Sequence, residues 1–548
     1  MRRSLGLMAA AVSIAMLLAG CSGGGSGSSA NGGILRIGIS TPIDSLNPFV
    51  SESDYSSVVY QYVYPHLVEY DANLKLAPSF ATSWATSQGG RVWTFHTRPG
   101  QEWSDGTPLT AKDAAFTLNM MVKYKNGPTG DLGQLVEGLK KTTTPDDNTL
   151  VLHYSHPVAN VLAQMQGVHI LPPKVWGPLA TGNGSKIRTF QNNAVPMVSG
   201  GPFTMVKYTV KQTALFQRNP HWYGQKPHIA GFGLQMFGTS DAMVAALKAG
   251  DIDMTGEFTP PTVVKALKSA GLVVDTAPSL TFNNFIINTN PKKTSHRELL
   301  DPKVREAMEY AIDRAQIIKT AYLGYATPGD SVVAPASGWA DPSLKGLPFS
   351  LAKANQILDG LGYTKGSNGV RVADGHPMVY NLVFPTEIAG AGDRTFAIIA
   401  NDFKKIGIVL KENRMDPDAA QTAIEAPKTS YTGFDLAMWD WVLPPDPQNV
   451  LGVLTCAQLG NNSDSGYCNP AYDKLFAEQG AVVDQAKRQR IVTRMARMIF
   501  DARPYIVIDY PDIIEAHSKK WTGFVMSPLV GSVNNMSTQT LVDVHQVG

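Results

Sequence analysis

Hydrophobic and polar residues alternate along three short stretches of the chain, and this period of two predicts β-strands. The stretches are residues 35–39, 93–97 and 150–154. Alternation indicates a strand because successive side chains of a strand point to opposite faces.

A second pattern predicts helices. Asp301 followed by Pro302 supplies an N-cap and a proline in the first turn. Apolar residues then recur at helical spacing and form one stripe, at Val304, Met308, Ala311, Ile312 and Ala315. Residues 241–248, with Gly250 as a stop signal, and residues 481–500 are further predicted helices. Strands and helices together predict an α/β fold.

The N-terminus has the pattern of a secretory signal. Arg2 and Arg3 precede an apolar run over residues 5–18, and small residues lead to Cys21. The run is shorter than the roughly 20 apolar residues that cross a bilayer. Residues 18–21 (LAGC) resemble a bacterial lipobox, so we interpret residues 1–20 as a lipoprotein signal peptide and Cys21 as the lipidated residue.

Residues 21–34 follow as the lipidated cysteine and a Gly/Ser-rich tether. Such a segment behaves as a flexible coil. It is expected to attach the folded body to the outer face of the cytoplasmic membrane, or to hold it in the periplasm, through a lipid anchor. No later segment is long and apolar enough to be a second membrane span.

Composition narrows the function classes. The 548 residues carry a formal net charge of +2, with 43% hydrophobic and 17% charged residues, which is typical of a globular protein of more than one domain. Basic residues are scattered, so no nucleic-acid partner is expected. Cys456 and Cys468 are predicted to form a disulfide, because an exported protein is exposed to oxidising conditions. No metal site is expected, since no nearby His or further Cys completes a ligand set.

Several motifs occur in order along the mature chain. They lie at residues 77–84, 92–100, 103–113, 201–203, 218–222, 246–253, 301–314 and 433–435. The stretch 103–113 (WSDGTPLTAKD) is the most distinctive. Together these motifs resemble the family-5 extracellular solute-binding proteins, the oligopeptide and dipeptide receptors of ABC importers.

The resemblance implies a two-lobed, periplasmic-binding-protein-like fold of class II, with an inserted subdomain and a hinge between the lobes. Because the family's chain crosses between lobes, the expected domains are discontinuous. We expect lobe I at residues 35–67, 196–285 and 510–548, the inserted subdomain at 68–195, and lobe II at 286–509.

The resemblance also implies a function. The chain is expected to be a monomer that captures a peptide or oligosaccharide between its lobes and delivers it to ABC permease and ATPase subunits, without a cofactor. An alternative is a ligand-sensing or chaperone-like lipoprotein of the same fold, and a nickel or haem carrier is another option within the family. The sequence lacks a His-Glu-x-x-His motif, a nucleophile elbow and a Walker loop, which disfavours an enzyme.

In this family, ligand contacts come from three segments, which correspond here to residues 44–55, 279–288 and 437–447. The ligand-binding residues expected from them are Asn47, Tyr55, Phe282, Asn283, Asn284, Trp439, Asp440 and Trp441. In a strand, Trp439 and Trp441 share one face and Asp440 takes the other. Indole rings offer flat apolar faces suited to peptides and sugars alike.

One position departs from the family pattern. Peptide-binding members carry an aspartate a few residues after the tryptophan, which pairs with the ligand's α-ammonium, and this chain has Pro444 there. A buried ammonium without a carboxylate is strongly unfavourable. Asp440 or Asp446 are possible substitutes, although neither has the matching offset. Pro444 therefore favours a neutral ligand, an oligosaccharide in particular, over a peptide with a free amine.

Overall fold

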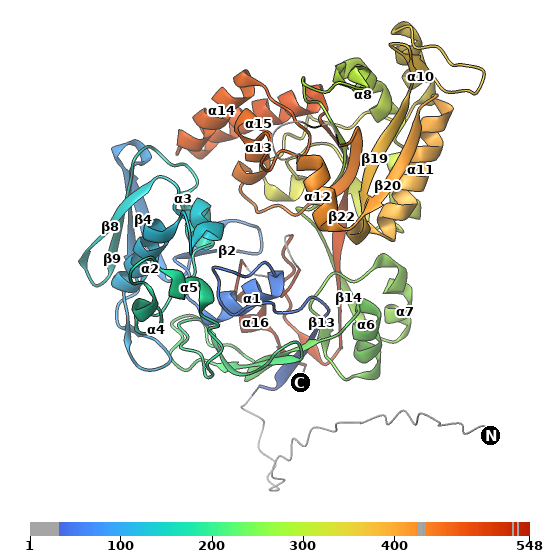
Figure 1. Ribbon diagram of the computed structural model, residues 1–548. Coiled ribbons are helices and arrows are strands. Elements are labelled where there is room, and N and C mark those ends of the chain that lie inside the picture. The colour runs from blue at the N-terminus through green and yellow to red at the C-terminus, as the bar shows by residue number, and fades with distance from the viewer. Residues whose placement is uncertain (1–31, 426–430, 432, 529–530, 534–535, 548) are drawn as a thin grey trace, which may run out of the picture.

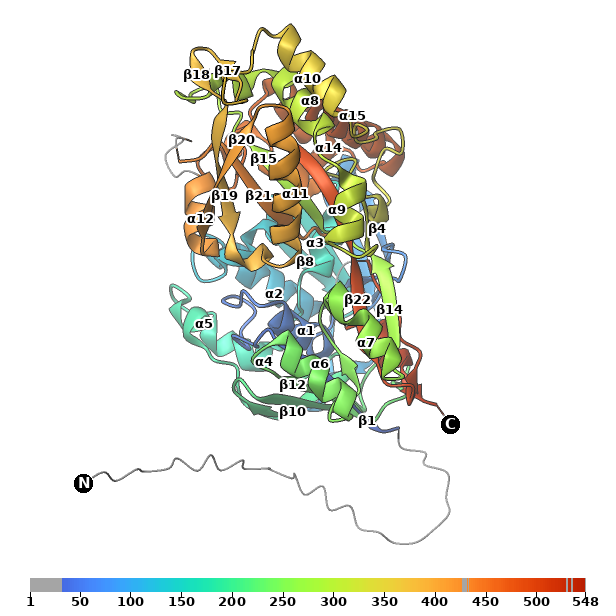
Figure 2. The ribbon, with the colours of Figure 1, turned by 90° about the vertical axis from the view of Figure 1, so that its right-hand side faces the viewer.

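The computed structural model describes residues 32–425, 431, 433–528, 531–533 and 536–547. The predicted signal peptide, Cys21 and most of the tether lie outside these residues. Helices and strands are assembled into two bodies, seen in Figure 2 as an upper one with yellow and orange elements and a lower one with blue and green elements (Figures 1 and 2). Within the described ranges, no helix is both long and apolar enough to cross a membrane.

A twelve-stranded mixed sheet runs through both bodies. Its strand order is β10-β11-β12-β1-β13-β22-β15-β21-β19-β20, with β14 and β16 paired to β22 beside this path. The bounds of these strands are β1 (Ile34–Ile39), β10 (Phe203–Thr209), β11 (Thr213–Arg218), β12 (Gly231–Met236), β13 (Met254–Thr255), β14 (Val273–Pro278), β15 (Phe282–Ile287), β16 (Ala326–Pro328), β19 (Val379–Pro385), β20 (Val409–Met415), β21 (Leu436–Trp441) and β22 (Tyr505–His517).

Strand β22 connects the two halves of this sheet. Its residues 512–517 pair with β14, whereas residues 505–509 pair with β15. In Figure 2, β22 and β14 run side by side from the upper body into the lower one. We call the half with β1 and β10 to β13 lobe I, and the half with β15, β19, β20 and β21 lobe II.

A separate four-stranded antiparallel sheet, in the order β4-β5-β9-β8, lies beside lobe I (Figure 1, left). Its strands are β4 (Ala81–Ser87), β5 (Val92–Thr97), β8 (Leu139–Asp146) and β9 (Thr149–Tyr154). Helix α2 (Ala111–Tyr124) packs on it and begins with a capping box formed by Thr110 and Asp113. This sheet and lobe I share one continuous apolar core, whereas lobe II is built around two others.

Further helices and short strands complete the chain. The helices are α1 (Asp54–Val63), α3 (Val161–Gln166), α4 (Pro173–Trp176), α5 (Ser185–Thr189), α6 (Ser240–Ala249), α7 (Val264–Ser269), α10 (Leu351–Gly360), α11 (Ala391–Lys405), α12 (Pro417–Glu425), α13 (Gln448–Val453) and α16 (Gln539–Asp543). The short strands are β2 (Val68–Tyr70), β3 (Leu76–Pro78), β6 (Gln101–Glu102), β7 (Pro108–Leu109), β17 (Val372–Ala373), β18 (His376–Pro377), β23 (Trp521–Thr522) and β24 (His545–Gln546).

The local predictions are largely confirmed. The three alternating stretches form β1, β5 and β9. The helix predicted at residues 241–248 is α6, which begins after the N-cap Thr239 and ends at Gly250 in the left-handed conformation (φ 81°). The residue boundaries of the lobes and of the inserted subdomain remain a prediction.

Two helix predictions were partly wrong. Residues 302–315 form two helices, α8 (Pro302–Tyr310) and α9 (Arg314–Thr320), because Asp313 caps a new helix by accepting a hydrogen bond from the N–H of Gln316. Ala315 is consequently exposed and lies outside the apolar stripe. The helix predicted at residues 481–500 is α15 (Gln485–Ala502), whereas Ala481 ends α14 (Pro470–Ala481).

Candidate ligand cavity between the lobes

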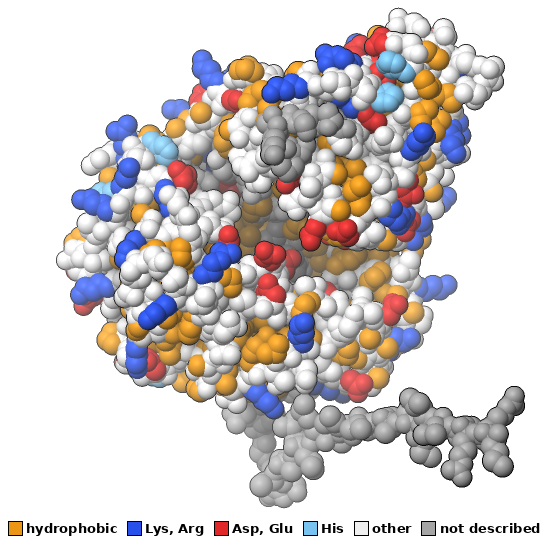
Figure 3. Space-filling model, in the orientation of Figure 1, with side chains coloured by type: hydrophobic (Ala, Val, Ile, Leu, Met, Phe, Trp, Pro, Cys, Tyr) orange, Lys and Arg blue, Asp and Glu red, His pale blue; other side chains and the backbone are white. Residues whose placement is uncertain are grey.

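A cavity of about 780 Å³ lies where lobe I, lobe II and strand β22 meet. Figure 3 shows the hollow between the two bodies, with acidic and hydrophobic side chains along its edge. Its volume lies within the range of about 300–1,000 Å³ that is usual for small-molecule sites. Lobe I contributes residues of α1 and residues 256–258, lobe II contributes β21 and the start of α11, and β22 contributes residues 511–513.

The lobe II wall is formed by the pairing of β21 with β15. Trp439 lies opposite Asn284, and Asp440 lies opposite Asn283. Trp439 and Trp441 pack on the same apolar cluster of lobe II, which matches the expectation that they share one face of the strand. All four side chains, and that of Trp441, line the cavity.

Asn283 belongs to a polar cluster at the base of this wall. Its Nδ2 donates hydrogen bonds to the Tyr322 hydroxyl at 2.8 Å and to Asp509 Oδ1 at 2.7 Å. Burial raises the pKa of Asp509 to about 7, and the hydrogen bond from Asn283 acts in the opposite direction. Tyr322 also lines the cavity. Asn283 is therefore held in place by Tyr322 and by Asp509 of the connecting strand β22.

Trp441 is positioned by a residue from a distant loop. Its Nε1 donates to Asp464 Oδ2 at 3.2 Å, and the Tyr505 hydroxyl donates to Asp464 Oδ1. Asp464 lies between Cys456 and Cys468, which are joined by a disulfide. Burial raises the pKa of Asp464 to about 7. The disulfide loop thus supports the orientation of a cavity-lining indole.

The lobe I wall is formed around Tyr55 and Glu257. The Tyr55 hydroxyl donates a hydrogen bond to the carbonyl oxygen of Gly256. Glu257 Oε1 accepts hydrogen bonds from the backbone N–H groups of Ser40 at 2.6 Å and Thr41 at 2.5 Å. Asp54, in the first turn of α1, lines the cavity beside them, and burial followed by the charge of Glu257 raises its pKa.

Five carboxylates line this cavity: Asp54, Glu257, Glu387, Asp440 and Asp512. No Lys, Arg or His is among its lining residues in the described parts of the chain. Burial, followed by the charge of Glu387, raises the pKa of Asp440 to about 6. The site is therefore acidic, whereas Pro444 alone favoured a neutral ligand.

The structure also assigns a role to the other candidate aspartate, Asp446. Its two carboxylate oxygens accept hydrogen bonds from Arg488 at 2.6 and 2.7 Å. This bidentate pair is largely buried. Asp446 is therefore engaged within the protein, and Asp440 is the candidate substitute that lines the cavity.

Two residues expected at the site lie elsewhere. Asn47 is fully buried, and its Nδ2 donates to the carbonyl oxygens of Ile187 and Phe190, so its polar groups stabilise a loop. Phe282 is fully buried in the apolar core of lobe II. Neither lines the cavity, whereas the remaining expected residues do.

Sequence reasoning missed several cavity residues. Asp54 lies within the predicted segment 44–55 and was overlooked, whereas Glu257, Glu387, Tyr322 and Asp512 come from segments that no motif singled out. No local signal identifies these four, because the tertiary fold alone brings them to one cavity. In the described ranges, no group of three or more His, Cys, Asp or Glu is arranged to hold a metal ion.

Two lobes joined by a crossing strand around a ligand-sized cavity define the class of two-lobed solute-binding proteins. The model for the middle region of the bacterial extracellular solute-binding proteins, family 5, matches residues 75–461. The chain therefore belongs to family 5 of the bacterial extracellular solute-binding proteins.

Curated relatives match nearly the whole chain. Protein XP55 of Streptomyces lividans is 26% identical over 91% of this chain and 88% of its own. The glutathione-binding protein GsiB of Escherichia coli K12 is 23% identical over 90% and 92%. The nickel-binding periplasmic protein of the same organism is 25% identical over 82% and 83%.

Solved structures share the fold. The ABC transporter substrate-binding protein CtaP of Listeria monocytogenes has a TM-score of 0.80 at 19% identity, covering 94% of this chain and 100% of its own. The oligopeptide-binding protein AppA of Bacillus subtilis, solved with a nonapeptide, has a TM-score of 0.74 at 20% identity, covering 94% and 99%. These similarities confirm the predicted two-lobed α/β architecture.

Proposed function

We propose that this chain is the lipid-anchored, extracytoplasmic substrate-binding component of an ABC importer, and that it captures a peptide or oligosaccharide between its lobes. The observation that carries the proposal is the cavity of about 780 Å³ enclosed by both lobes and the crossing strand β22. Relatives named for glutathione, nickel and oligopeptides support a role in capturing small solutes.

The geometry suits reversible capture. Tyr55 and Asp54 stand on lobe I, whereas Trp439, Asp440 and Trp441 stand on lobe II, so a ligand in the cavity contacts both lobes. Closure around a hinge buries such a ligand from both sides. The closed form is populated only when ligand contacts exceed the cost of closure. A receptor of this kind releases its cargo to a permease when the lobes reopen.

Between the two cargo classes, the polar groups of the cavity favour a peptide. Asn284 offers an amide donor and acceptor, and the carboxylates offer partners for ammonium groups. The aromatic faces of Trp439 and Trp441 suit either class. Pro444 itself does not line the cavity, whereas five carboxylates from other positions do.

Native mass spectrometry of the full-length lipoprotein purified from its own membrane tests this function. We expect a co-purified solute of small mass, which is then released and identified. Deletion of the gene is expected to reduce uptake of that solute by intact cells. Unchanged uptake would favour the sensing or chaperone-like role, and turnover of the solute by the purified protein would indicate an enzyme.

A further inference from the structure

The cavity carries negative charge on every side. Asp54 and Glu257 belong to lobe I, Glu387 and Asp440 to lobe II, and Asp512 to the crossing strand β22. No basic side chain is among the described residues that line it. These carboxylates therefore line the same space that a ligand fills.

The protein itself leaves these charges largely uncompensated. Among the described residues, the hydrogen bonds to the Glu257 carboxylate come from backbone N–H groups and the Ser40 hydroxyl, which are dipoles and leave its charge in place. No other described residue donates a hydrogen bond to the carboxylate of Asp440. Arg394 of α11 donates to the carbonyl oxygen of Ala321 at 2.9 Å and does not line the cavity.

The pKa values of Asp440 and Asp54 are raised, as expected for carboxylates close to other carboxylates. The charge of Glu387 adds to the effect of burial in raising the pKa of Asp440, and the charge of Glu257 does the same for Asp54. Like charges that are close together and partly desolvated disfavour one another's ionised form. A cation placed between them relieves that repulsion.

A second and independent observation concerns Asn284. Its side chain is 0% exposed, it lines the cavity, and neither its Oδ1 nor its Nδ2 has a hydrogen-bond partner within the described structure. A buried amide without hydrogen-bond partners is destabilising, because its desolvation is not compensated. The group that complements it must offer both an acceptor and a donor, as a peptide bond does.

We propose that the ligand is a peptide with a net positive charge, bound through its ammonium groups to Asp440 and the other carboxylates of the cavity and through a peptide bond to Asn284. This inference rests on the proposed function and narrows its substrate class. The indole rings of Trp439 and Trp441 add to the selection, because ammonium groups are attracted to aromatic faces. An anionic peptide is rejected by charge, and a neutral one leaves the carboxylates unpaired.

Isothermal titration calorimetry with the full-length protein tests the proposal. The probes are the tetrapeptides Ala-Lys-Lys-Ala, Ala-Ala-Ala-Ala and Ala-Glu-Glu-Ala, together with spermidine and maltotetraose. We expect Ala-Lys-Lys-Ala to bind about tenfold or more tightly than Ala-Ala-Ala-Ala, and Ala-Glu-Glu-Ala not to bind. The preference is expected to shrink between about 20 mM and about 200 mM salt, because salt screens charges that remain accessible to solvent.

A matched pair of variants distinguishes a local effect of a carboxylate in the cavity from an effect of the protein's net charge. Asp440→Asn is expected to weaken Ala-Lys-Lys-Ala by about tenfold, as for loss of one charge partner. It should weaken Ala-Ala-Ala-Ala less, because that peptide carries one ammonium group whereas Ala-Lys-Lys-Ala carries three. Glu478→Gln removes one exposed carboxylate from α14, outside the cavity, and is expected to change neither affinity. Equal losses in both variants would contradict a local role for Asp440.

The outcomes distinguish the inference of a cationic peptide from the proposed receptor function. Preference for a neutral or acidic peptide would overturn the charge inference and leave the receptor function intact. Binding of spermidine without any peptide would overturn the assignment of a peptide, and binding of maltotetraose alone would point to an oligosaccharide receptor. Failure of every probe to bind would overturn the inference and count against the proposed function.

Discussion

The indole of Trp441 donates a hydrogen bond of 3.2 Å to the buried carboxylate of Asp464. The two residues lie 23 positions apart, on strand β21 and in the loop closed by the disulfide. The Tyr505 hydroxyl of strand β22 donates to the same carboxylate. A cavity-lining side chain is thus connected to both the disulfide loop and the crossing strand through one acidic group.

The buried carboxylate of Asp464 predicts how the stability of the protein depends on pH. Burial raises its pKa to about 7 in the folded state, from an ordinary value of 3.8. Between these two values the unfolded chain binds fewer protons than the native chain, so stability falls as pH rises through this window and is greatest below it. Asp509 and Glu515, with pKa values raised by burial to about 7, act in the same direction.

We therefore expect the free energy of unfolding to be higher at about pH 5.5 than at about pH 8. Urea denaturation at both pH values measures the difference. Asp464→Asn, which cannot ionise, is expected to reduce the difference without abolishing it, because Asp509 and Glu515 remain. A stability that rises with pH over this range would contradict the assignment.

Trp441→Ala is expected to weaken binding of the solute identified by mass spectrometry by about 1–3 kcal/mol, as for loss of an aromatic anchor. The protein should remain folded, because Trp441 is only partly buried. Calorimetry measures the affinity. Trp222→Ala, which removes an indole that does not line the cavity, is the control and should bind normally. Unchanged affinity in Trp441→Ala would remove this residue from the site.

The disulfide between Cys456 and Cys468 closes a loop with a sequence separation of 12. Reduction with dithiothreitol is expected to destabilise the protein by about 3 kcal/mol at most, since a short loop restricts the unfolded chain only modestly. Thermal unfolding with and without the reductant measures this effect. The double variant Cys456→Ala, Cys468→Ala should be insensitive to the reductant. If its stability still falls with the reductant, the effect does not come from this disulfide.

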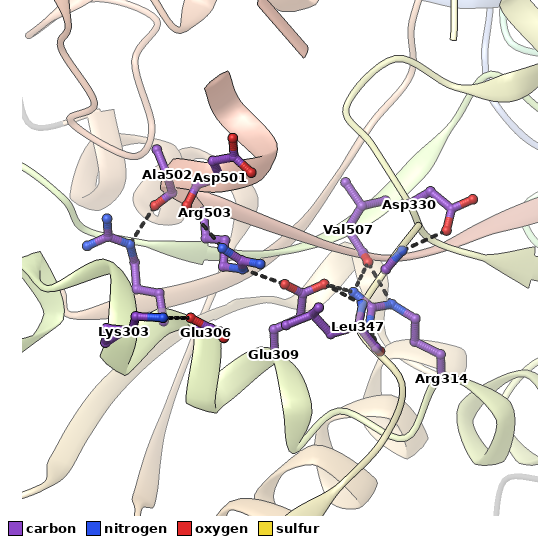
Figure 4. Close-up of polar contacts among 12 residues, drawn as sticks. Lys303, Glu306, Glu309, Arg314, Asp330, Leu347, Asp501, Ala502, Arg503 and Val507 are labelled. Carbon is purple, nitrogen blue, oxygen red and sulfur yellow. Dashed lines mark hydrogen bonds and ion pairs between the residues drawn. The ribbon is translucent and has the colours of Figure 1, made fainter. Parts of the chain in front are cut away.

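Glu309 gives a prediction about lobe II (Figure 4). It pairs with Arg314 at 3.2 Å and with Arg503 at 2.6 Å, and Arg314 also donates to the carbonyl oxygen of Val507 on β22. Glu309→Ala leaves buried guanidinium groups unpaired and is expected to destabilise the protein by about 3–5 kcal/mol.

The matched control is Glu306→Ala on the same helix. Glu306 pairs with the exposed Lys303 at 2.7 Å, and an exposed pair of this kind contributes at most about 1 kcal/mol. Urea denaturation of both variants compares the two costs. Equal losses would show that burial of the Glu309 network has no special importance.

Cys21→Ser is expected to release the protein from membranes, because the proposed anchor depends on lipidation of this thiol. More than one acyl chain is required for stable attachment, so a variant without the lipid has no comparable affinity for the bilayer. Fractionation of cells followed by immunoblotting measures the distribution. Continued recovery in the membrane fraction would rule out lipid anchoring at this residue.

Local patterns were enough to predict those helices and strands that are determined by residues close together in the chain. The alternation in β1, β5 and β9, the cap at Asp301 and the stop at Gly250 depend on neighbouring residues, and the structure confirms them. The helix prediction across residues 302–315 was wrong at its end because a second cap, Asp313, competes with the apolar stripe. Family motifs extended these local patterns to the two-lobed architecture.

The chemistry of the cavity was decided by long-range packing. Pro444 favoured a neutral ligand, because the sequence shows which residues are present and does not show which of them meet. The tertiary structure pairs Asp446 with Arg488, buries Asn47 against backbone carbonyls, and brings Asp54, Asp440 and Asp512 to one cavity. Charge in a binding site depends on which groups the fold leaves without partners, and that depends on contacts between segments hundreds of residues apart.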